Sequence, residues 1–379
     1  MNIEPNLRFR WIAGDGYPMA GTKHKIKHSM SKNKSQNSQK GLLLIVVAMA
    51  LLTNCTNSFE KQPEAVKEIL PAGAIAQQTE KPVERLDTAE YDRRFDSLIS
   101  QVKSKKWTEL EDVYPYPGAI LPFKRVVAYY GNFYSEKMGI LGELPEDEML
   151  AKLKTEVEKW ENADTATKVV PAIHYIAVTA QRSPGKANKY RLRMPKDQIE
   201  KAVRIAEKAG AIVILDIQIG MSSLAEELPQ LDTFLKMPNV HLGIDPEFSM
   251  KTGARPGKKI GSFDAEDVNY ASKYLAGLVQ LFKLPPKILV VHRFTKPMLT
   301  NYKDIMLRPE VQVVVQMDGW GGRAKKKGTY RQVIYPEPVQ FAGFKIFYKN
   351  DTKSGKDTTE MQPEEVLQLA PKPIYIQYQ

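Results

Sequence analysis

Acidic and polar side chains recur at the ends of short apolar segments in this 379-residue chain. Asp216 and Gln218 end one segment, Asp245 and Glu247 end another, and Asp318 ends a third. Side chains of a strand alternate between its two faces, so residues i and i+2 point the same way. Carboxyl groups that share a water-poor site push their pKa values apart, as general acid/base catalysis requires. We therefore predict that these four acids are catalytic.

Other polar residues occupy similar positions on neighbouring segments. His292 ends its segment and joins the predicted catalytic set, whereas His241 begins its segment and is predicted to be structural. Helix caps, turns and structural ion pairs are the alternative roles for each of these polar groups. The predicted substrate-binding residues are Tyr130, His174, Gln218, Lys345 and Gln377, together with the aromatic residues Phe294 and Trp320.

Aromatic side chains occur close to the same segment ends. The apolar C–H faces of sugar rings stack on aromatic rings, so this composition favours a carbohydrate or another small polar substrate. Ordinary core packing is the alternative. The aromatic residues concerned are Tyr130, Phe133, Tyr134, Phe248, Phe294, Trp320 and Tyr378.

Strand-like segments alternate with segments of helical period, which predicts a single (β/α)₈ barrel over residues 125–379. An open doubly wound sheet is the alternative, but no glycine-rich phosphate turn follows the first strand. The predicted strands are Arg125–Tyr130, Lys168–Ile176, Ala211–Gln218, Val240–Asp245, Lys287–His292, Val311–Met317, Phe341–Tyr348 and Pro373–Tyr378. The predicted helices are Glu146–Ala163, Lys196–Ala209, Ser222–Lys236, Asp264–Phe282, Lys296–Met306 and Pro363–Ala370, and 319–340 is predicted to be an irregular loop.

The chain before the barrel divides into four predicted segments. Residues 1–29 are interpreted as an over-extended start before Met30, and 30–54 have the basic and apolar regions of a secretory signal peptide. Residues 55–90 are rich in Pro, Glu, Lys, Thr and Gln and predict a flexible tether. A helical, Pro-rich lead-in follows over 91–124.

The single cysteine, Cys55, ends the apolar run of the predicted signal peptide. The sequence Leu52–Cys55 resembles the lipobox of bacterial lipoproteins, with Asn54 where that family prefers a small residue. This resemblance implies cleavage before Cys55 and lipidation of its thiol. The expected location is the bacterial cell envelope, on the outer membrane or the periplasmic face, and the mature protein would contain no disulfide.

The net charge of +11 does not predict a nucleic-acid partner, because residues 1–40 carry +6 of it. The basic cluster in the body of the protein is Arg323–Lys327. We predict that it is a solvated loop, with a site for an acidic polymer as the alternative.

Two stretches resemble known barrels. Val126–Gly131 resembles the first strand of many glycoside-hydrolase barrels. The stretch from Tyr129 to Gly322 resembles uncharacterised bacterial secreted or lipoprotein barrels, which implies the fold and a polar mouth but no particular reaction. The chain lacks the Asp-x-x-Asp-x-Asp-x-Glu run of chitinase-like enzymes, and its seventh strand offers Lys345 where retaining glycosidases place a glutamate.

Three functions remain open. In an anchored glycoside hydrolase, which needs no cofactor, Glu247 would donate the proton, Asp216 or Asp318 would act as nucleophile or base, and Asp245 would tune Glu247. In a metal-dependent hydrolase such as a phosphodiesterase, Asp216, Asp245, Glu247 and His292 would bind Mg²⁺, Ca²⁺ or Zn²⁺. In a non-catalytic glycan-binding lipoprotein, the carboxylates would only bind hydroxyls. The chain has no Gly-x-Ser-x-Gly motif, P-loop or zinc-finger spacing.

Overall fold

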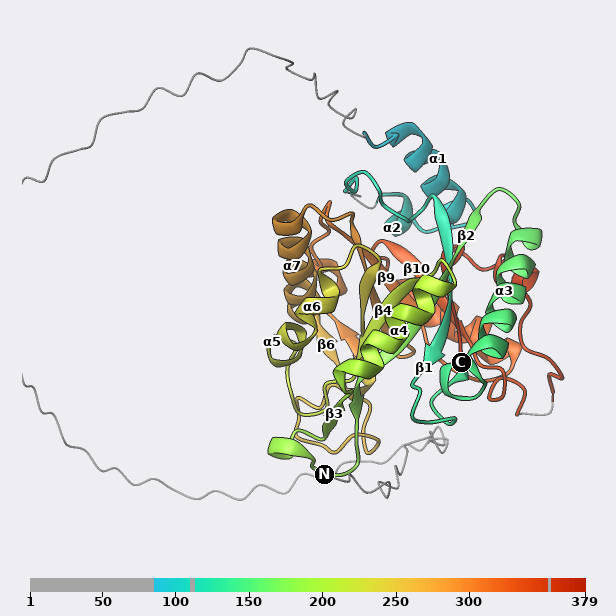
Figure 1. The fold of residues 1–379 in the computed structure, drawn as a ribbon. Coiled ribbons are helices and arrows are strands. Elements are labelled where there is room, and N and C mark those ends of the chain that lie inside the picture. The colour runs from blue at the N-terminus through green and yellow to red at the C-terminus, as the bar shows by residue number, and fades with distance from the viewer. Residues whose placement is uncertain (1–84, 110–112, 354–355) are drawn as a thin grey trace, which may run out of the picture. The chain divides into compact units, whose positions relative to one another are not determined.

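The computed structural model describes residues 85–109, 113–353 and 356–379 and contains a closed (β/α)₈ barrel (Figure 1). The main sheet has the order β1-β11-β10-β9-β7-β5-β4-β2-β3, and β1 also pairs with β2, so every strand except β3 belongs to a parallel ring. The ring strands are β1 (Lys124–Gly131), β2 (Lys168–Ala180), β4 (Ile212–Ile217), β5 (Val240–Ile244), β7 (Lys287–Arg293), β9 (Val311–Met317), β10 (Phe341–Ile346) and β11 (Tyr375–Tyr378). The predicted barrel and all eight predicted strands are confirmed.

The long helices around the barrel also follow the sequence pattern. They are α3 (Glu146–Ala163), α4 (Lys196–Lys208) and α7 (Ala265–Phe282). Acidic residues fill the first turn of α3, where they oppose the positive end of the helix dipole. Asp264 and Asp267 form a capping box at the start of α7, and Lys283 ends that helix in a left-handed conformation.

Three helix predictions need correction, because the chain turns where a single helix was expected. The segment Ser222–Lys236 is broken into α5 (Leu224–Glu227), a 3₁₀ turn η3 (Leu228–Leu231) that contains Pro229, and α6 (Asp232–Leu235). The segment Lys296–Met306 holds two 3₁₀ turns, η5 (Lys296–Met298) and η6 (Tyr302–Asp304), around the two-residue strand β8 (Leu299–Thr300). The last helix, α9 (Pro363–Val366), is shorter than predicted.

The loop predicted over 319–340 is also wrong. It contains α8 (Arg323–Thr329) followed by a π-helical turn, η7 (Tyr330–Ile334). The basic cluster Arg323–Lys327 is therefore helical. Lys326 is buried and pairs with Asp351 at 2.9 Å, so this cluster is not simply solvated.

The lead-in segment covers the N-terminal end of the barrel. It contains α1 (Thr88–Ile99) and α2 (Lys105–Thr108), which lie at the opposite end of the barrel from β3 (Arg191–Arg193) in Figure 1. Gln312, at the start of β9, accepts hydrogen bonds from the backbone amides of Ile120 and Leu121 at 3.1 and 3.0 Å. These contacts close the N-terminal end of the barrel, so a site open to substrate is expected at the C-terminal ends of the strands.

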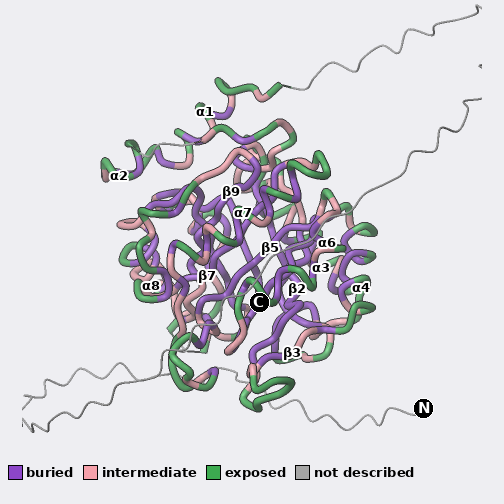
Figure 2. The backbone as a smooth tube through the Cα atoms, turned by 90° about the vertical axis from the view of Figure 1, so that its left-hand side faces the viewer, coloured by how far each residue is buried: buried purple, intermediate pink, exposed green. Residues whose placement is uncertain are grey.

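Burial is concentrated in the strands and in the inner faces of the helices, as Figure 2 shows. The strand register places Tyr130 beside His174, and Asp216 beside Gly243. The parallel register also places His292 beside Gln316, and Lys345 beside Gln377. The interior of the barrel near the C-terminal ends of the strands is therefore polar, whereas most barrel interiors are filled with branched apolar side chains.

The N-terminal predictions lie outside the described residues. These are the over-extended start, the signal peptide, Cys55 and most of the predicted tether. Across the part of the chain that the structure does describe, no helix is both long enough and apolar enough to cross a lipid bilayer.

Candidate active site

Asp216 lies at the centre of a buried cluster near the C-terminal ends of the strands. Its Oδ2 accepts a hydrogen bond from the Tyr130 hydroxyl at 3.0 Å. Its Oδ1 lies 3.6 Å from His174 Nε2 and 3.4 Å from His292 Nε2. All three neighbours come from different strands, so barrel closure brings them together.

A second chain of contacts runs from His292 of β7 to Lys345 of β10, two strands further round the barrel. His292 Nδ1 lies 2.9 Å from Asp318 Oδ2, and Lys345 Nζ lies 2.9 Å from Asp318 Oδ1. The Lys345 ammonium also sits 3.9 Å above the centre of the Tyr130 ring. Lys345 therefore forms a buried ion pair with Asp318, which is one of the alternative roles that the sequence left open.

Asp245 and Glu247 form the third part of the site. The Gln218 amide donates to Asp245 Oδ2 at 3.3 Å, and Asp245 Oδ1 accepts from the backbone amide of Glu247 at 3.1 Å. Glu247 stands on the 3₁₀ turn η4 (Pro246–Phe248) and is half-buried, whereas Asp245 is buried. Glu247 is thus the more accessible member of this pair.

The imidazole of His174 is held in place by polar side chains of β11 and β9. Its Nδ1 lies 2.6 Å from the Tyr375 hydroxyl and 2.7 Å from the Gln377 amide nitrogen, and Gln377 accepts from the Gln316 amide at 3.0 Å. Gln377 is fully buried in this layer, so it supports His174 rather than lining the mouth. Tyr375 was missed at the sequence level, although it lies two residues before Gln377 and hence on the same face.

Three groups of the cluster favour their charged forms. Burial opposes the negative charge of Asp216, but His292 and His174 outweigh it and hold the pKa of Asp216 well below its ordinary range. Burial likewise opposes the charge of Asp318, yet Lys345 and His292 lower the pKa of that carboxyl. The charges of Asp216 and Asp318 outweigh the burial of His292 and raise its pKa to about 10.

In the other three groups, burial shifts the pKa toward the neutral form. Burial raises the pKa of Asp245 to about 7, with the charges of Asp216 and Asp318 adding to the rise against His292. Burial, followed by the charges of Asp245 and Asp318, raises the pKa of Glu247 to about 8. Burial lowers the pKa of His174 to about 4. The mouth therefore holds a protonated carboxyl and an ionised carboxylate at neutral pH.

The aromatic predictions are met only in part. Tyr130 lies in the cluster, Phe294 follows β7 and packs beside Gly319, and Trp320 packs under the Lys325 ammonium at 4.6 Å. Tyr378 was predicted at the rim, but it accepts a hydrogen bond from Trp160 of α3 at 2.9 Å and faces the outer helices. Alternation of side chains along β11 explains this, since Gln377 points inward.

Phe133 also faces the outer helices. Its ring stacks on Tyr175 with centroids 4.7 Å apart, and Lys201 of α4 lies 4.6 Å above it. His241 is structural as predicted: its Nδ1 accepts from the backbone amide of Ile288 at 3.0 Å, near the start of the strands.

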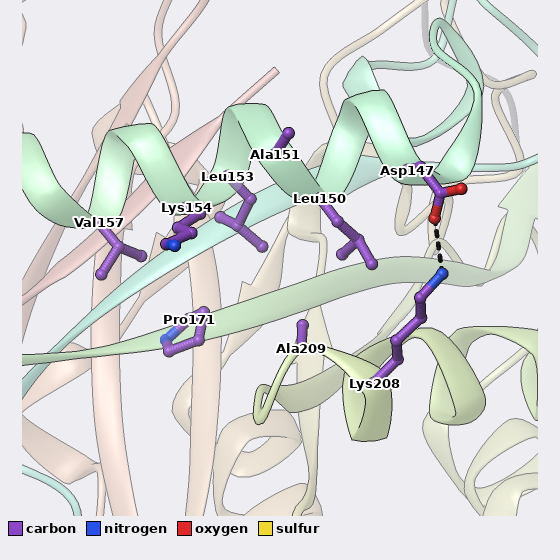
Figure 3. A pocket seen from close by; sticks show the side chains of 9 residues that line it. All are labelled: Asp147, Leu150, Ala151, Leu153, Lys154, Val157, Pro171, Lys208 and Ala209. Atoms are coloured by element: carbon purple, nitrogen blue, oxygen red, sulfur yellow. Dashed lines mark hydrogen bonds and ion pairs between the residues drawn. The ribbon is translucent and has the colours of Figure 1, made fainter.

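A hollow of about 500 Å³ lies on the outside of the barrel, between α3 and α4 (Figure 3). Leu150, Leu153 and Val157 of α3 face Pro171 of β2 across it, and an ion pair between Asp147 and Lys208 spans one end at 2.6 Å. This hollow contains none of the predicted catalytic residues.

Comparison with known proteins leaves the family open. No family model matches the chain, and no curated protein matches it. A solved hyperthermophilic endo-beta-1,4-glucanase in complex with substrate aligns with a TM-score of 0.36 and 11% identity, over 68% of this chain and 89% of its own. GH26C from Muricauda sp. MAR_2010_75 aligns with a TM-score of 0.28 and 10% identity, over 70% of this chain and 75% of its own. Similarity at this level identifies no reaction.

Proposed function

We propose that the protein is a hydrolase of glycosidic bonds in which Glu247 is the general acid. One observation carries this proposal: Glu247 and Asp318 share one electrostatic environment, yet the pKa of Glu247 is raised to about 8 and the pKa of Asp318 is lowered. A neutral carboxyl beside an ionised one is the combination that protonates a leaving oxygen while stabilising or attacking the sugar carbon.

The geometry separates the roles of the other three acids. Asp216 is fully buried and is surrounded by Tyr130, His174 and His292, which suits a group that positions its neighbours. Asp318 follows the end of β9 and is the better candidate for base or nucleophile. Asp245 helps to keep Glu247 protonated, because its charge is one cause of the raised pKa of Glu247.

The test compares two kinds of substrate in the Glu247→Gln variant. An alkyl glycoside has a poor leaving group and needs the acid, so kcat should fall by roughly 10²–10⁴. The dinitrophenolate group of a dinitrophenyl glycoside leaves without protonation, so kcat on that substrate should fall much less. Glu266→Gln, at the exposed start of α7, is the control and should match the wild type on both substrates.

Two results would contradict this proposal. An equal loss on both substrates would remove Glu247 as the acid. Binding of glycans without any turnover of aryl or alkyl glycosides in either anomeric form would favour the non-catalytic glycan-binding function instead.

We further propose that this hydrolase is attached to the bacterial cell envelope by a lipid on Cys55. The support is the sequence alone: a basic region, an apolar run and a cysteine at its end. In cells fed an alkyne fatty acid, the wild type should be labelled and should partition into detergent. Cys55→Ala should lose both properties, and labelling that persists in this variant would contradict the anchor.

A further inference from the structure

Three buried ligand atoms point at one another without hydrogen-bond partners. They are His174 Nε2, His292 Nε2 and Asp216 Oδ1, and all three side chains are fully buried. These atoms all lie within 4.8 Å of one another. The two Nε2 contacts with Asp216 Oδ1, at 3.6 and 3.4 Å, are long for hydrogen bonds, so a species bound between the three atoms would satisfy all of them better.

The second polar atom of each of these side chains contacts another residue of the barrel. Asp318 fixes His292 through Nδ1 at 2.9 Å, and Tyr375 lies 2.6 Å from Nδ1 of His174. The Tyr130 hydroxyl binds the other oxygen of Asp216 at 3.0 Å. Carboxylates and hydroxyls on the far side of imidazole and carboxylate groups are the outer contacts that orient metal ligands.

The backbone leaves space at the point where the three atoms converge. Gly243 lies beside Asp216 in the strand register. A Cβ atom at residue 243 would lie 2.7 Å from Asp216 Oδ1 and 2.7 Å from His174 Nε2. Any side chain there would intrude on the converging atoms, so glycine keeps this space open.

We propose that His174, Asp216 and His292 bind a divalent first-row transition metal ion, with zinc as the best fit. The Nε2 atoms lie 3.6 and 3.4 Å from Asp216 Oδ1. Ligands of a tetrahedral zinc ion with bonds of about 2.0–2.2 Å are separated by about 3.3–3.6 Å. Two imidazoles favour zinc, iron or nickel over magnesium and calcium, which prefer oxygen ligands.

Metal binding requires both imidazoles to be neutral, so His292 must release the Nε2 proton that the neighbouring carboxylates favour in the metal-free protein. Ligation through Nε2 of His174 places its proton on Nδ1, where the Tyr375 hydroxyl accepts it. The Gln377 amide must then flip so that its oxygen faces Nδ1. This flip exchanges the amide oxygen and nitrogen and leaves the shape of the side chain unchanged. Gln316, which contacts Gln377 at 3.0 Å, can turn with it, since its own amide oxygen has no hydrogen-bond partner.

The experiment titrates the chelator-stripped full-length protein with Zn²⁺, and with Co²⁺ as a spectroscopic probe. The wild type should bind one ion per chain, and Co²⁺ should develop the visible absorption of a four- or five-coordinate site. His174→Gln and His292→Gln should each weaken Zn²⁺ binding by more than about 100-fold. Asp318→Asn should weaken it by about 10–100-fold, because Asp318 contacts His292 but is not itself a ligand. His241→Asn is the matched control: it replaces a buried histidine of β5 near the other end of the barrel and should bind as the wild type does.

X-ray absorption of the zinc-loaded wild type tests the site without any variant, and should show two imidazole nitrogens and at least one oxygen. The proposal is overturned if the folded wild type binds Zn²⁺ no more tightly than the His174→Gln variant, or if His241→Asn weakens binding equally. With an ion on His292, Lys345 and the ion supply the positive charge near Asp318, and the two proposals are tested by different readouts. Glu247→Gln should keep full Zn²⁺ affinity, so loss of turnover with metal retained concerns only the general acid.

Discussion

Lys345 Nζ lies 2.9 Å from Asp318 Oδ1, inside the barrel, and both side chains are at least nine-tenths buried. The other oxygen of Asp318 lies 2.9 Å from His292 Nδ1. A single carboxylate in such a place would take up a proton, because burial disfavours its charge. In the metal-free protein, these two cations explain why Asp318 can stay ionised inside the barrel.

Replacing Lys345 by methionine should therefore destabilise the fold. The buried Asp318 would keep only His292 as a cationic neighbour, so the free energy of unfolding should fall by about 3 kcal/mol. Lys349→Met is the matched control, because Lys349 pairs with Glu143 at 2.8 Å but is 71% exposed, and it should cost about 1 kcal/mol or less. Urea denaturation measures both. Equal losses for the two variants would show that the buried pair contributes no more than a surface pair.

Strand periodicity in the sequence was enough to predict the barrel. Segments such as Val311–Met317 are apolar along their whole length, as parallel strands buried on both faces must be. The helix at Glu146–Ala163 was predicted to the residue because its polar and apolar positions alternate with the helical period. The region 319–340 was misread because glycines at its start and a basic run hid the helix that begins at Arg323.

Side-chain alternation predicted which acids lie near one another, but it did not predict the contacts that cross the barrel. The positions of Asp216, Asp245 and Asp318 follow from strand ends alone. The Tyr375 contact with His174 joins residues 201 positions apart, so no local pattern reveals it. The same holds for Lys326 of α8, whose buried partner Asp351 lies after the end of β10.

Substitution of Gly243 by alanine should destabilise the protein by about 1–3 kcal/mol. The added Cβ would lie 2.7 Å from both Asp216 Oδ1 and His174 Nε2, and neither buried side chain can move aside freely. Gly277→Ala is the control, since Gly277 lies in α7 with no atom within 4 Å of the new Cβ. That variant should gain about 0.5–1 kcal/mol from helix propensity. Thermal melting compares the two, and a Gly243→Ala protein as stable as the wild type would mean that the space is larger than described.

Glu227 and its neighbour Glu226 provide a second matched pair. Glu227 is fully buried and lies 2.7 Å from both Arg191 Nε and Arg193 Nε, whereas the Glu226 side chain is 41% exposed. Glu227→Gln should lower the free energy of unfolding at pH 7 by about 3 kcal/mol, because two arginines lose their shared counter-ion. Glu226→Gln should lower it by at most about 1 kcal/mol.

The loss in Glu227→Gln should also depend on pH. Burial opposes the charge of Glu227, but Arg193, Ser222 and Arg191 outweigh it and lower the pKa from its ordinary value of 4.5. A group whose pKa is lower in the folded state stabilises the fold fully above its unfolded pKa and loses that effect as pH falls through its folded pKa. The difference between wild type and variant should therefore shrink below pH 4.5. A difference that stays constant down to pH 2 would show that packing, not charge, is responsible.

The pH dependence of turnover tests the role of Glu247 directly. A general acid works only when protonated, and the pKa of Glu247 is raised to about 8 by burial, by Asp245 and by Asp318. Activity on an alkyl glycoside should therefore fall as pH rises through about 8, tenfold for each further unit. Asp245→Asn removes one of the charges that raise this pKa, so its alkaline limit should move to lower pH while activity at pH 6 persists. If Asp245 were instead the base, the same variant would be inactive at every pH, and the two roles are distinguished by one pH profile of kcat/KM.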